Sequence, residues 1–594
     1  MVGIRSVVLA IAVLGGIELS AQLPPVFDVD VAAKARSTDL VREYLVPKRV
    51  VWKSDDSGHF VRRPEMLLGS GTGQADLSSD RTFAIRNRGD VQNGILLDFG
   101  REIQGGIRIV TTKATADPAG RIRIRLGESV GEAMSELGKD GSSNIHAMRD
   151  FEVTLPHLGS LEVGNSGFRF ARIDLLDPDS VINIKEIRAI LTYRDIPYIG
   201  SFESSDKRLN DIWMTGAYTV QLNMQDYLWD GIKRDRLVWV GDMHPEIMTI
   251  NSVFGYNEVV PKSLDFVRDA TPLPGWMNGI SSYSIWWILI QRDWYLYQGD
   301  LGYLKEQEGY LVGLLKQLED NIGTDGFEKL GEERFLDWPS SQDKAAIHAG
   351  LQALMVMGFE AGAELCADLD NAEGQAVCEE ALERLQGRVP EMGDSKQAAA
   401  LLALAGLVQP QRADAVLRSQ DGMTGMTTFY GYYMLEARAK AGDFTGAMDT
   451  IRDFWGAMLN LGATTFWEDF NIDWTKNAAR IDELTPDGKV DVHATYGNYS
   501  YKQFRHSLCH GWASGPTAWL TRYVLGVNVE EPGCRKVRIA PHLGDLQWVK
   551  GSFPTRFGPI KIENRKMPDG SVKTTYSAPA EVTVVVDSSA SPEQ

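Results

Sequence analysis

The densest group of ionisable side chains in the sequence lies in one short segment, from Asp230 to Asp242. The segment holds three acids, three bases and Trp239, and two glycines interrupt it. Because a solvated charged surface has no need of glycine and tryptophan at these places, we interpret the segment as a loop that binds sugar hydroxyls. One of its carboxyl groups would be held protonated as a general acid. A structural ion-pair loop is the alternative interpretation.

Acid–aromatic pairs elsewhere supply further candidate groups. Trp467 precedes Glu468, Asp337 precedes Trp338, and Trp287 belongs to a tryptophan pair. Aromatic faces suit the apolar faces of sugar rings, and two carboxyl groups on opposite sides of a glycosidic bond can cleave it. One group protonates the leaving oxygen, and the other activates water or attacks carbon. These residues predict a glycoside hydrolase that needs no cofactor and acts on a carbohydrate substrate.

The elements that must position these groups differ along the chain. Residues 22–200 show the alternation of half-buried strands, clearest at 121–126, and predict an N-terminal β-sandwich domain. Residues 201–526 show about a dozen helical stretches and predict a catalytic (α/α)6 barrel, since no fixed repeat supports an α-solenoid. Alternation returns in residues 527–594, which predict a small C-terminal β-sandwich. The clearest helical stretches are 303–318, 345–363, 372–385, 397–407 and 445–459.

The composition limits the partners of the protein. A chain of 594 residues is too long for one core, and its formal net charge of -19 argues against nucleic acid or an anionic membrane as the main partner. His506 and His510 are four residues apart, but no matching pair of ligands accompanies them, so we predict no metal site. Cys366 and Cys378 could form a disulfide or remain buried thiols. The sequence leaves the oligomeric state open.

The N-terminus has the features of a secretory signal. Arg5 is followed by an uncharged apolar run, Val7 to Ile17, which is too short to span a bilayer as a helix. We predict a signal peptide of residues 1–21 that is cleaved after Ala21. The mature chain would then be periplasmic or secreted, with no segment inserted in a membrane.

Three motifs together resemble those of one enzyme family. The segment Asp230 to Asp242 resembles the signature of the α-L-rhamnosidases of glycoside hydrolase family 78, in which Asp, Cys-Pro-Gln-Arg, an acid pair and Arg-Leu-Gly-Trp-Thr-Gly-Asp follow in order. One acid of the pair is missing here, and Gly-Ile-Lys replaces Cys-Pro-Gln. The segment 462–468 resembles the family's second motif, and 507–510 resembles the third, Ser-Leu-Asn-His. The order of the three predicted domains also matches.

The resemblance implies an inverting α-L-rhamnosidase that acts on rhamnose-containing glycans or glycosides. It places Asp235 at the position of the general acid and Glu468 at that of the general base. It further implies sugar contacts for a set of other residues, namely Asp230, Arg234, Trp239, Asp242, Trp338, Trp467 and His510. Two alternatives remain: a glycosidase or lyase for another sugar, such as a uronic-acid-containing polysaccharide, and a non-catalytic carbohydrate-binding protein.

Overall fold

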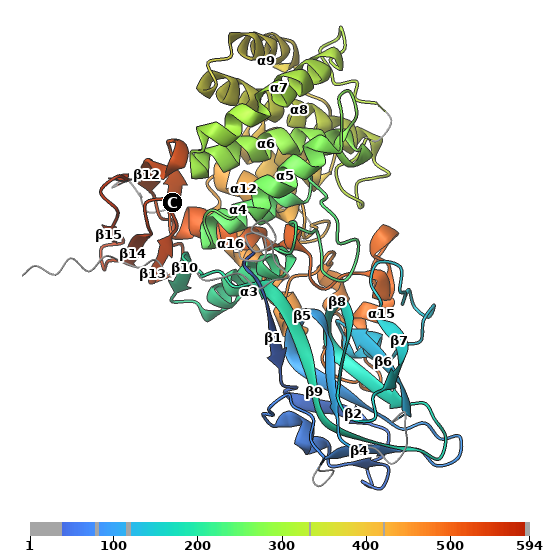
Figure 1. Cartoon of the computed structure of the whole chain (residues 1–594). Coiled ribbons are helices and arrows are strands. Elements are labelled where there is room, and N and C mark those ends of the chain that lie inside the picture. The colour runs from blue at the N-terminus through green and yellow to red at the C-terminus, as the bar shows by residue number, and fades with distance from the viewer. Residues whose placement is uncertain (1–37, 78–81, 114–119, 332–333, 420–421, 588–594) are drawn as a thin grey trace, which may run out of the picture.

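The computed structural model describes residues 38–77, 82–113, 120–331, 334–419 and 422–587. The predicted signal peptide lies outside these ranges. A helical domain adjoins a large N-terminal sheet domain at one end and two small sheets at its side (Figure 1). The predicted order of sheet domain, helical barrel and small C-terminal sheet domain is confirmed.

The N-terminal domain is built from nine antiparallel strands. They form one continuous hydrogen-bonded sheet in the order β3-β4-β9-β5-β8-β6-β7, with β1 paired to β9 and β2 paired to β5. Alternate residues of β6, including Ile122 and Ile124, are fully buried in its aliphatic core, as the alternating sequence predicts. The strands are β1 (Leu40–Leu45), β2 (Arg49–Lys53), β3 (Val61–Arg62), β4 (Phe83–Arg86), β5 (Gly94–Thr111), β6 (Gly120–Gly127), β7 (Asp150–Leu155), β8 (Ser160–Leu175) and β9 (Val181–Arg194).

Six of the described helices form a closed inner ring in the helical domain. Each contacts the next, and the last contacts the first: α4 (Met243–Val253), α6 (Ser281–Gln298), α8 (Lys344–Asp368), α10 (Lys396–Leu404), α12 (Gly431–Lys440) and α16 (Gly515–Trp519). Closure of this ring excludes the solenoid alternative. Most residues of the ring helices are buried on every face, as expected for helices that are surrounded by others.

A second set of helices packs around this ring. These helices bury one face only, so that α9 (Ala372–Leu385) has four buried residues of fourteen. The outer set contains α3 (Lys207–Asn223), α5 (Val259–Asp269), α7 (Leu301–Asp320), α9, α11 (Pro410–Leu417), α13 (Phe444–Thr450) and α14 (Gly456–Asn460). Among the helices that the structure describes, none combines the length and the apolar character needed to cross a bilayer.

Two small sheets complete the C-terminal domain. One contains β11 (Val527–Val529), β12 (Lys536–Ile539) and β16 (Thr583–Val586). The other contains β10 (Ser201–Ser204), β13 (Trp548–Phe553), β14 (Ile560–Lys566) and β15 (Val572–Ser577). Strand β10 directly precedes α3 and pairs antiparallel with β13, so a strand from the start of the helical domain belongs to the C-terminal sheet. All four cysteines are free, buried thiols, and the disulfide considered between Cys366 and Cys378 is not formed.

Candidate active site

A cavity of about 540 Å³ lies where the loops of the helical domain meet. Eight of the predicted site residues line it: Asp230, Arg234, Asp235, Trp239, Asp242, Trp338, Glu468 and His510. They come from segments that are far apart in the sequence, so the barrel brings the predicted groups together. The cavity is large enough for a sugar unit and is open at one side.

Backbone hydrogen bonds join the three sequence motifs directly. The Gly511 N–H donates to the carbonyl of Asp230, and the His510 N–H donates to the carbonyl of Phe466, each at 2.9 Å. Gly231 and His510 also form an isolated antiparallel bridge. The third motif therefore lies between the first and the second and sets their separation.

Glu468 is held firmly at the bottom of the cavity. Its Oε2 accepts a hydrogen bond from the Ser507 N–H at 2.9 Å, and its Oε1 lies 3.1 Å from Nη2 of Arg234. Its carbonyl accepts hydrogen bonds from Thr428 and Trp512. Burial raises the pKa of the Glu468 carboxyl, while the Arg234 charge and the Ser507 N–H oppose this shift. The group is oriented as an acceptor, which suits a base.

Asp235 occupies a strained turn at the mouth of the cavity. Asp235 and Arg236 both adopt left-handed backbone conformations, with φ of 54° and 59°. Two consecutive non-glycine residues rarely do so, and such strain is often found at functional sites. The Asp235 Oδ1 lies 3.4 Å from Nε of Arg234 and 3.4 Å from Nδ1 of His146, a residue of the N-terminal sheet domain. The short turn thus places this carboxyl group at a boundary between two domains.

One guanidinium links the two candidate catalytic carboxyl groups. The Nε of Arg234 contacts Asp235 at 3.4 Å, and its Nη2 contacts Glu468 at 3.1 Å. Because both atoms belong to one small planar group, the two carboxyl oxygens can be no more than about 9 Å apart. An inverting glycosidase requires a separation of roughly 6.5–9.5 Å, so the upper limit set here is compatible with that mechanism.

Asp230, Asp242 and His510 form the polar floor of the cavity. The His510 Nε2 lies 3.6 Å from Asp230 and 4.0 Å from Asp242, and Tyr283 donates its hydroxyl to Asp242 at 2.6 Å. Burial, with the negative charge of nearby carboxylates, raises the pKa of both aspartates well above its usual value. Burial also lowers the pKa of His510 well below its usual value. Burial therefore favours neutral acids and a neutral imidazole, which can exchange hydrogen bonds with sugar hydroxyls. The same three groups lie close enough to ligate a cation.

Several residues that line the cavity have buried polar atoms without a hydrogen-bond partner among the described residues. These atoms are Arg234 Nε, Trp239 Nε1, Ser500 Oγ, Arg505 Nε and His510 Nδ1. Buried polar atoms in native proteins are normally paired, so a cluster of unpaired ones indicates a place where a ligand supplies the partners. A polyhydroxylated ligand can supply many donors and acceptors at once.

Aromatic side chains form the wall of the cavity. Trp338 is 38% exposed and stacks on Tyr499 with ring centroids 6.3 Å apart. Trp512 lies against the His510 ring at 4.1 Å, and Trp239 packs edge-on against Tyr283. Apolar ring faces beside buried carboxyl groups are suited to a sugar, whose ring has apolar faces and polar edges.

Comparisons with known proteins agree with this geometry. Residues 197–357 match the family model of the bacterial alpha-L-rhamnosidase six-hairpin glycosidase domain, and residues 526–593 match that of the bacterial alpha-L-rhamnosidase C-terminal domain. Two regions of the chain are thus similar to domains of bacterial α-L-rhamnosidases. No curated protein sequence matches the chain.

Solved rhamnosidase structures share the fold. The GH78 family rhamnosidase of Bacillus sp. GL1 superposes with a TM-score of 0.71 at 21% identity, over 89% of this chain and 56% of that one. A Klebsiella oxytoca rhamnosidase with rhamnose bound superposes with a TM-score of 0.64 at 18% identity, over 82% of this chain and 97% of that one. The Streptomyces avermitilis alpha-L-rhamnosidase complexed with L-rhamnose superposes with a TM-score of 0.67 at 17% identity, over 85% of this chain and 50% of that one. The chain thus spans about half the length of two of these three proteins.

Three residues predicted to bind substrate do not line the cavity of this rhamnosidase fold. Trp287 is fully buried in the ring helix α6, where its indole donates to the Leu264 carbonyl. Trp467 is 1% exposed and packs inside the helical core. Asp337 is 2% exposed and accepts a hydrogen bond from Gln397, so it supports the loop that carries Trp338. The structure does not bring these three side chains to the cavity, and their contacts with a sugar stay a prediction.

The cavity also contains residues that the sequence did not indicate. They are Ile280, Tyr283, Arg334, Phe335, Ser500, Arg505 and Trp512. Each comes from a loop or a helix start without regular spacing relative to the motifs. Only the closure of the barrel places them beside the predicted groups, so no local pattern could have identified them.

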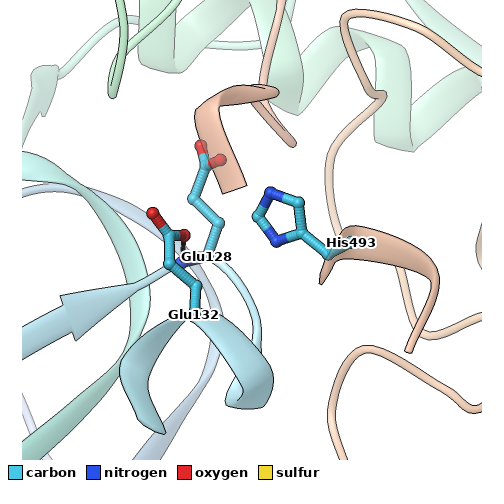
Figure 2. A group of neighbouring side chains, drawn as sticks. All are labelled: Glu128, Glu132 and His493. Atoms are coloured by element: carbon cyan, nitrogen blue, oxygen red, sulfur yellow. Dashed lines mark hydrogen bonds between the residues drawn. The ribbon is translucent and has the colours of Figure 1, made fainter. Parts of the chain in front are cut away.

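A second cluster of potential metal ligands lies between the two domains. Glu128 and Glu132 of the sheet domain converge with His493 of the helical domain (Figure 2), with ligand atoms within 4.8 Å of one another. The ammonium group of Lys233 lies 2.9 Å from Glu128 and 3.3 Å from Glu132, and it also donates to the His506 carbonyl. Lys233 therefore supplies the positive charge that this cluster requires. It stands where the resembled signature has Gln, and it links the sheet domain to the loop of residues 230–242.

Glu246 of α4 is fully buried just beneath the cavity, and neither of its carboxyl oxygens has a hydrogen-bond partner among the described residues. Burial, with the charges of Asp242 and Asp230, raises its pKa well above the usual value. Above pH 4.3, roughly the pKa of an unfolded Glu, the folded protein keeps a proton that the unfolded chain loses. Glu246 thus reduces the unfolding free energy by about 1.4 kcal/mol per pH unit until its folded pKa is reached.

Glu246→Gln, which has the shape of the neutral acid, should consequently be more stable than the parent at neutral pH. The difference should grow as the pH rises from 4 to 8, as measured by denaturant unfolding at each pH. Glu203→Gln is the matched control, because the Glu203 side chain is 58% exposed and pairs with Lys550 at the surface. A variant that is less stable at every pH would contradict the buried neutral acid.

Proposed function

We propose that the protein is an exported, inverting α-L-rhamnosidase. The observation that carries the proposal is the pair of carboxyl groups, Asp235 and Glu468, that contact one guanidinium across a sugar-sized cavity. The domains that the chain shares with bacterial α-L-rhamnosidases support the choice of sugar. Export rests on the apolar run after Arg5.

In the proposed reaction, rhamnose occupies the cavity with its hydroxyls on the polar floor. Asp235 donates a proton to the glycosidic oxygen as the bond to carbon 1 breaks. Glu468 accepts a proton from a water molecule that attacks carbon 1 from the opposite face. The released sugar then carries the inverted configuration, and the two carboxyl groups return to their first state when a proton passes from Glu468 to solvent and another returns to Asp235.

The two carboxyl groups differ in their contacts, and this difference fits different roles. Arg234 contacts both, and its positive charge favours their ionised forms. Glu468 has the closer contact to Arg234 and the N–H of Ser507 as a second donor, so it is better placed to hold the negative charge. In the proposed reaction Asp235 is the group that donates the proton to the leaving oxygen.

A panel of aryl glycosides tests the proposal. The aryl α-L-rhamnoside should be hydrolysed at least about 100-fold faster than the aryl glycosides of other sugars, because the buried floor selects the hydroxyl pattern. Proton NMR at early times should show β-L-rhamnose as the first product. An unsaturated product that absorbs in the ultraviolet would identify a lyase, and initial release of the α-anomer would contradict inversion. Protein purified from its native source should begin near Gln22.

A further inference from the structure

The carboxyl groups of the cavity differ in their exposure to solvent, and this difference indicates where the leaving group of the substrate would lie. The Asp235 side chain is 17% exposed, whereas those of Asp230 and Glu468 are each 3% exposed. If Asp235 is the acid, as the proposed function requires, the leaving group begins beside it and extends to the solvent side. The buried floor is then left for the rhamnose ring.

Three polar side chains surround this outer part of the cavity. Ser500 and Arg505 line the cavity itself, and His146 contacts Asp235 from the sheet domain. Burial lowers the pKa of His146, the charge of Asp235 opposes this shift, and the positive charges of Arg234 and Arg505 add to it, so that the pKa lies below its usual value. His146 is therefore neutral at neutral pH, and Arg505 provides the positive charge beside the leaving group.

Arg505 differs from the other two arginines of the cavity in having no partner. Arg234 contacts Glu468, and Arg334 donates to the Glu328 carboxylate at 2.9 Å. Among the described residues, none forms a hydrogen bond or an ion pair with the Arg505 side chain, and its Nε is buried. A guanidinium that is partly withdrawn from water without an acceptor costs free energy, which a ligand with the right acceptor can recover.

The donor groups of Arg505 and Ser500 indicate which acceptor would bind there. A guanidinium presents two parallel N–H groups, which match the two oxygens of a carboxylate, whereas a neutral hydroxyl offers one acceptor and no charge. The hydroxyl of Ser500, which is also buried without a partner, can donate to the same group. We propose that Arg505, with Ser500, binds the carboxylate of an acidic sugar on the leaving-group side. The substrate would then be a rhamnoside of a uronic acid.

A pair of disaccharides that differ in one group tests this assignment. The probes are α-L-rhamnosyl glucuronate and its carboxyl-reduced counterpart, α-L-rhamnosyl glucose. The wild-type enzyme should prefer the glucuronate in kcat/KM by about 10- to 100-fold, as expected for a charge-assisted hydrogen bond. Arg505→Gln should abolish this preference, so that the ratio of the two kcat/KM values falls close to one.

Lys502→Gln is the matched control, because Lys502 is exposed and carries the same charge three residues away. It should keep the wild-type ratio, which shows that the general field of the surface does not produce the preference. Equal kcat/KM values for the two disaccharides with wild-type enzyme would overturn the assignment. So would a ratio that is unchanged in Arg505→Gln.

Binding measurements separate this inference from the proposed reaction. Titration calorimetry with methyl glucuronoside and methyl glucoside requires no turnover. Tighter binding of the glucuronoside by wild-type protein, lost in Arg505→Gln and retained in Lys502→Gln, supports the carboxylate site even if no rhamnoside is hydrolysed. Hydrolysis of aryl rhamnoside without discrimination between the two methyl glycosides would support the reaction and overturn the carboxylate site.

Discussion

Glu468→Gln is expected to lower kcat/KM by about 1,000-fold or more on every rhamnoside, whatever its leaving group. Glutamine keeps the hydrogen bond from the Ser507 N–H but cannot take a proton from the attacking water. Rates should be compared on an aryl rhamnoside and a disaccharide, and both should fall alike. Asp469→Asn is the control, because Asp469 is the neighbouring carboxyl group but does not line the cavity.

The pH profile gives an independent measure of the same role. Glu468 must be ionised to act as a base, so activity should fall as the pH falls through its pKa, which burial raises and Arg234 lowers. Arg234→Met should therefore move the acidic limb of the pH profile of kcat/KM to higher pH, in addition to weakening binding.

If Glu468→Gln kept activity within about tenfold on both substrates, another group would have to activate the water.

Asp235→Asn should separate substrates by the quality of their leaving groups. A sugar leaving group needs protonation, so kcat/KM on a disaccharide should fall by about 1,000-fold. An activated aryl group leaves as a stable anion, so the loss on an aryl rhamnoside should be about tenfold or less. Asp242→Asn provides the contrast, since removal of a hydroxyl contact should slow both substrates equally.

An Asp235→Asn variant that stays active on a disaccharide would change the assignment of the general acid. Near-normal activity of Asp235→Asn on a disaccharide would assign the acid elsewhere, and Asp242, whose pKa burial raises well above its usual value, would be the first candidate. In that case Asp242→Asn should show the leaving-group dependence expected of Asp235→Asn.

The helical domain could be predicted from its sequence because its outer helices carry strong signals. The stretch 303–318 lies within α7, and 372–385 coincides with α9, whose start Asn371 caps by accepting a hydrogen bond from Gly374. The ring helices are buried on nearly every face, so their apolar residues have no preferred side. Trp287 of α6 is an example, since it is fully buried and does not line the cavity: in a surrounded helix, composition does not reveal which side chains face a site.

The site residues that lie in one continuous motif, from Asp230 to Asp242, could be predicted from the sequence. Contacts between domains produce no such local motif. His146 reaches Asp235, and Lys233 reaches Glu128, across long stretches of chain whose geometry depends on the assembled fold. The loop of residues 230–242 is thus held by contacts with the N-terminal sheet domain, which the sequence predicts as a separate domain.

The pairing of β10 with β13 affects when the protein can fold during its synthesis. The helical domain lies between these two strands in the sequence, so β10 has no partner until the whole helical domain and β13 have been made. Until then β10 has an open edge, which can pair with the wrong strand or with another chain. Pairing of this edge should therefore follow synthesis of the helical domain, and a ribosome-bound chain that stops before β13 should remain sensitive to protease around residue 200.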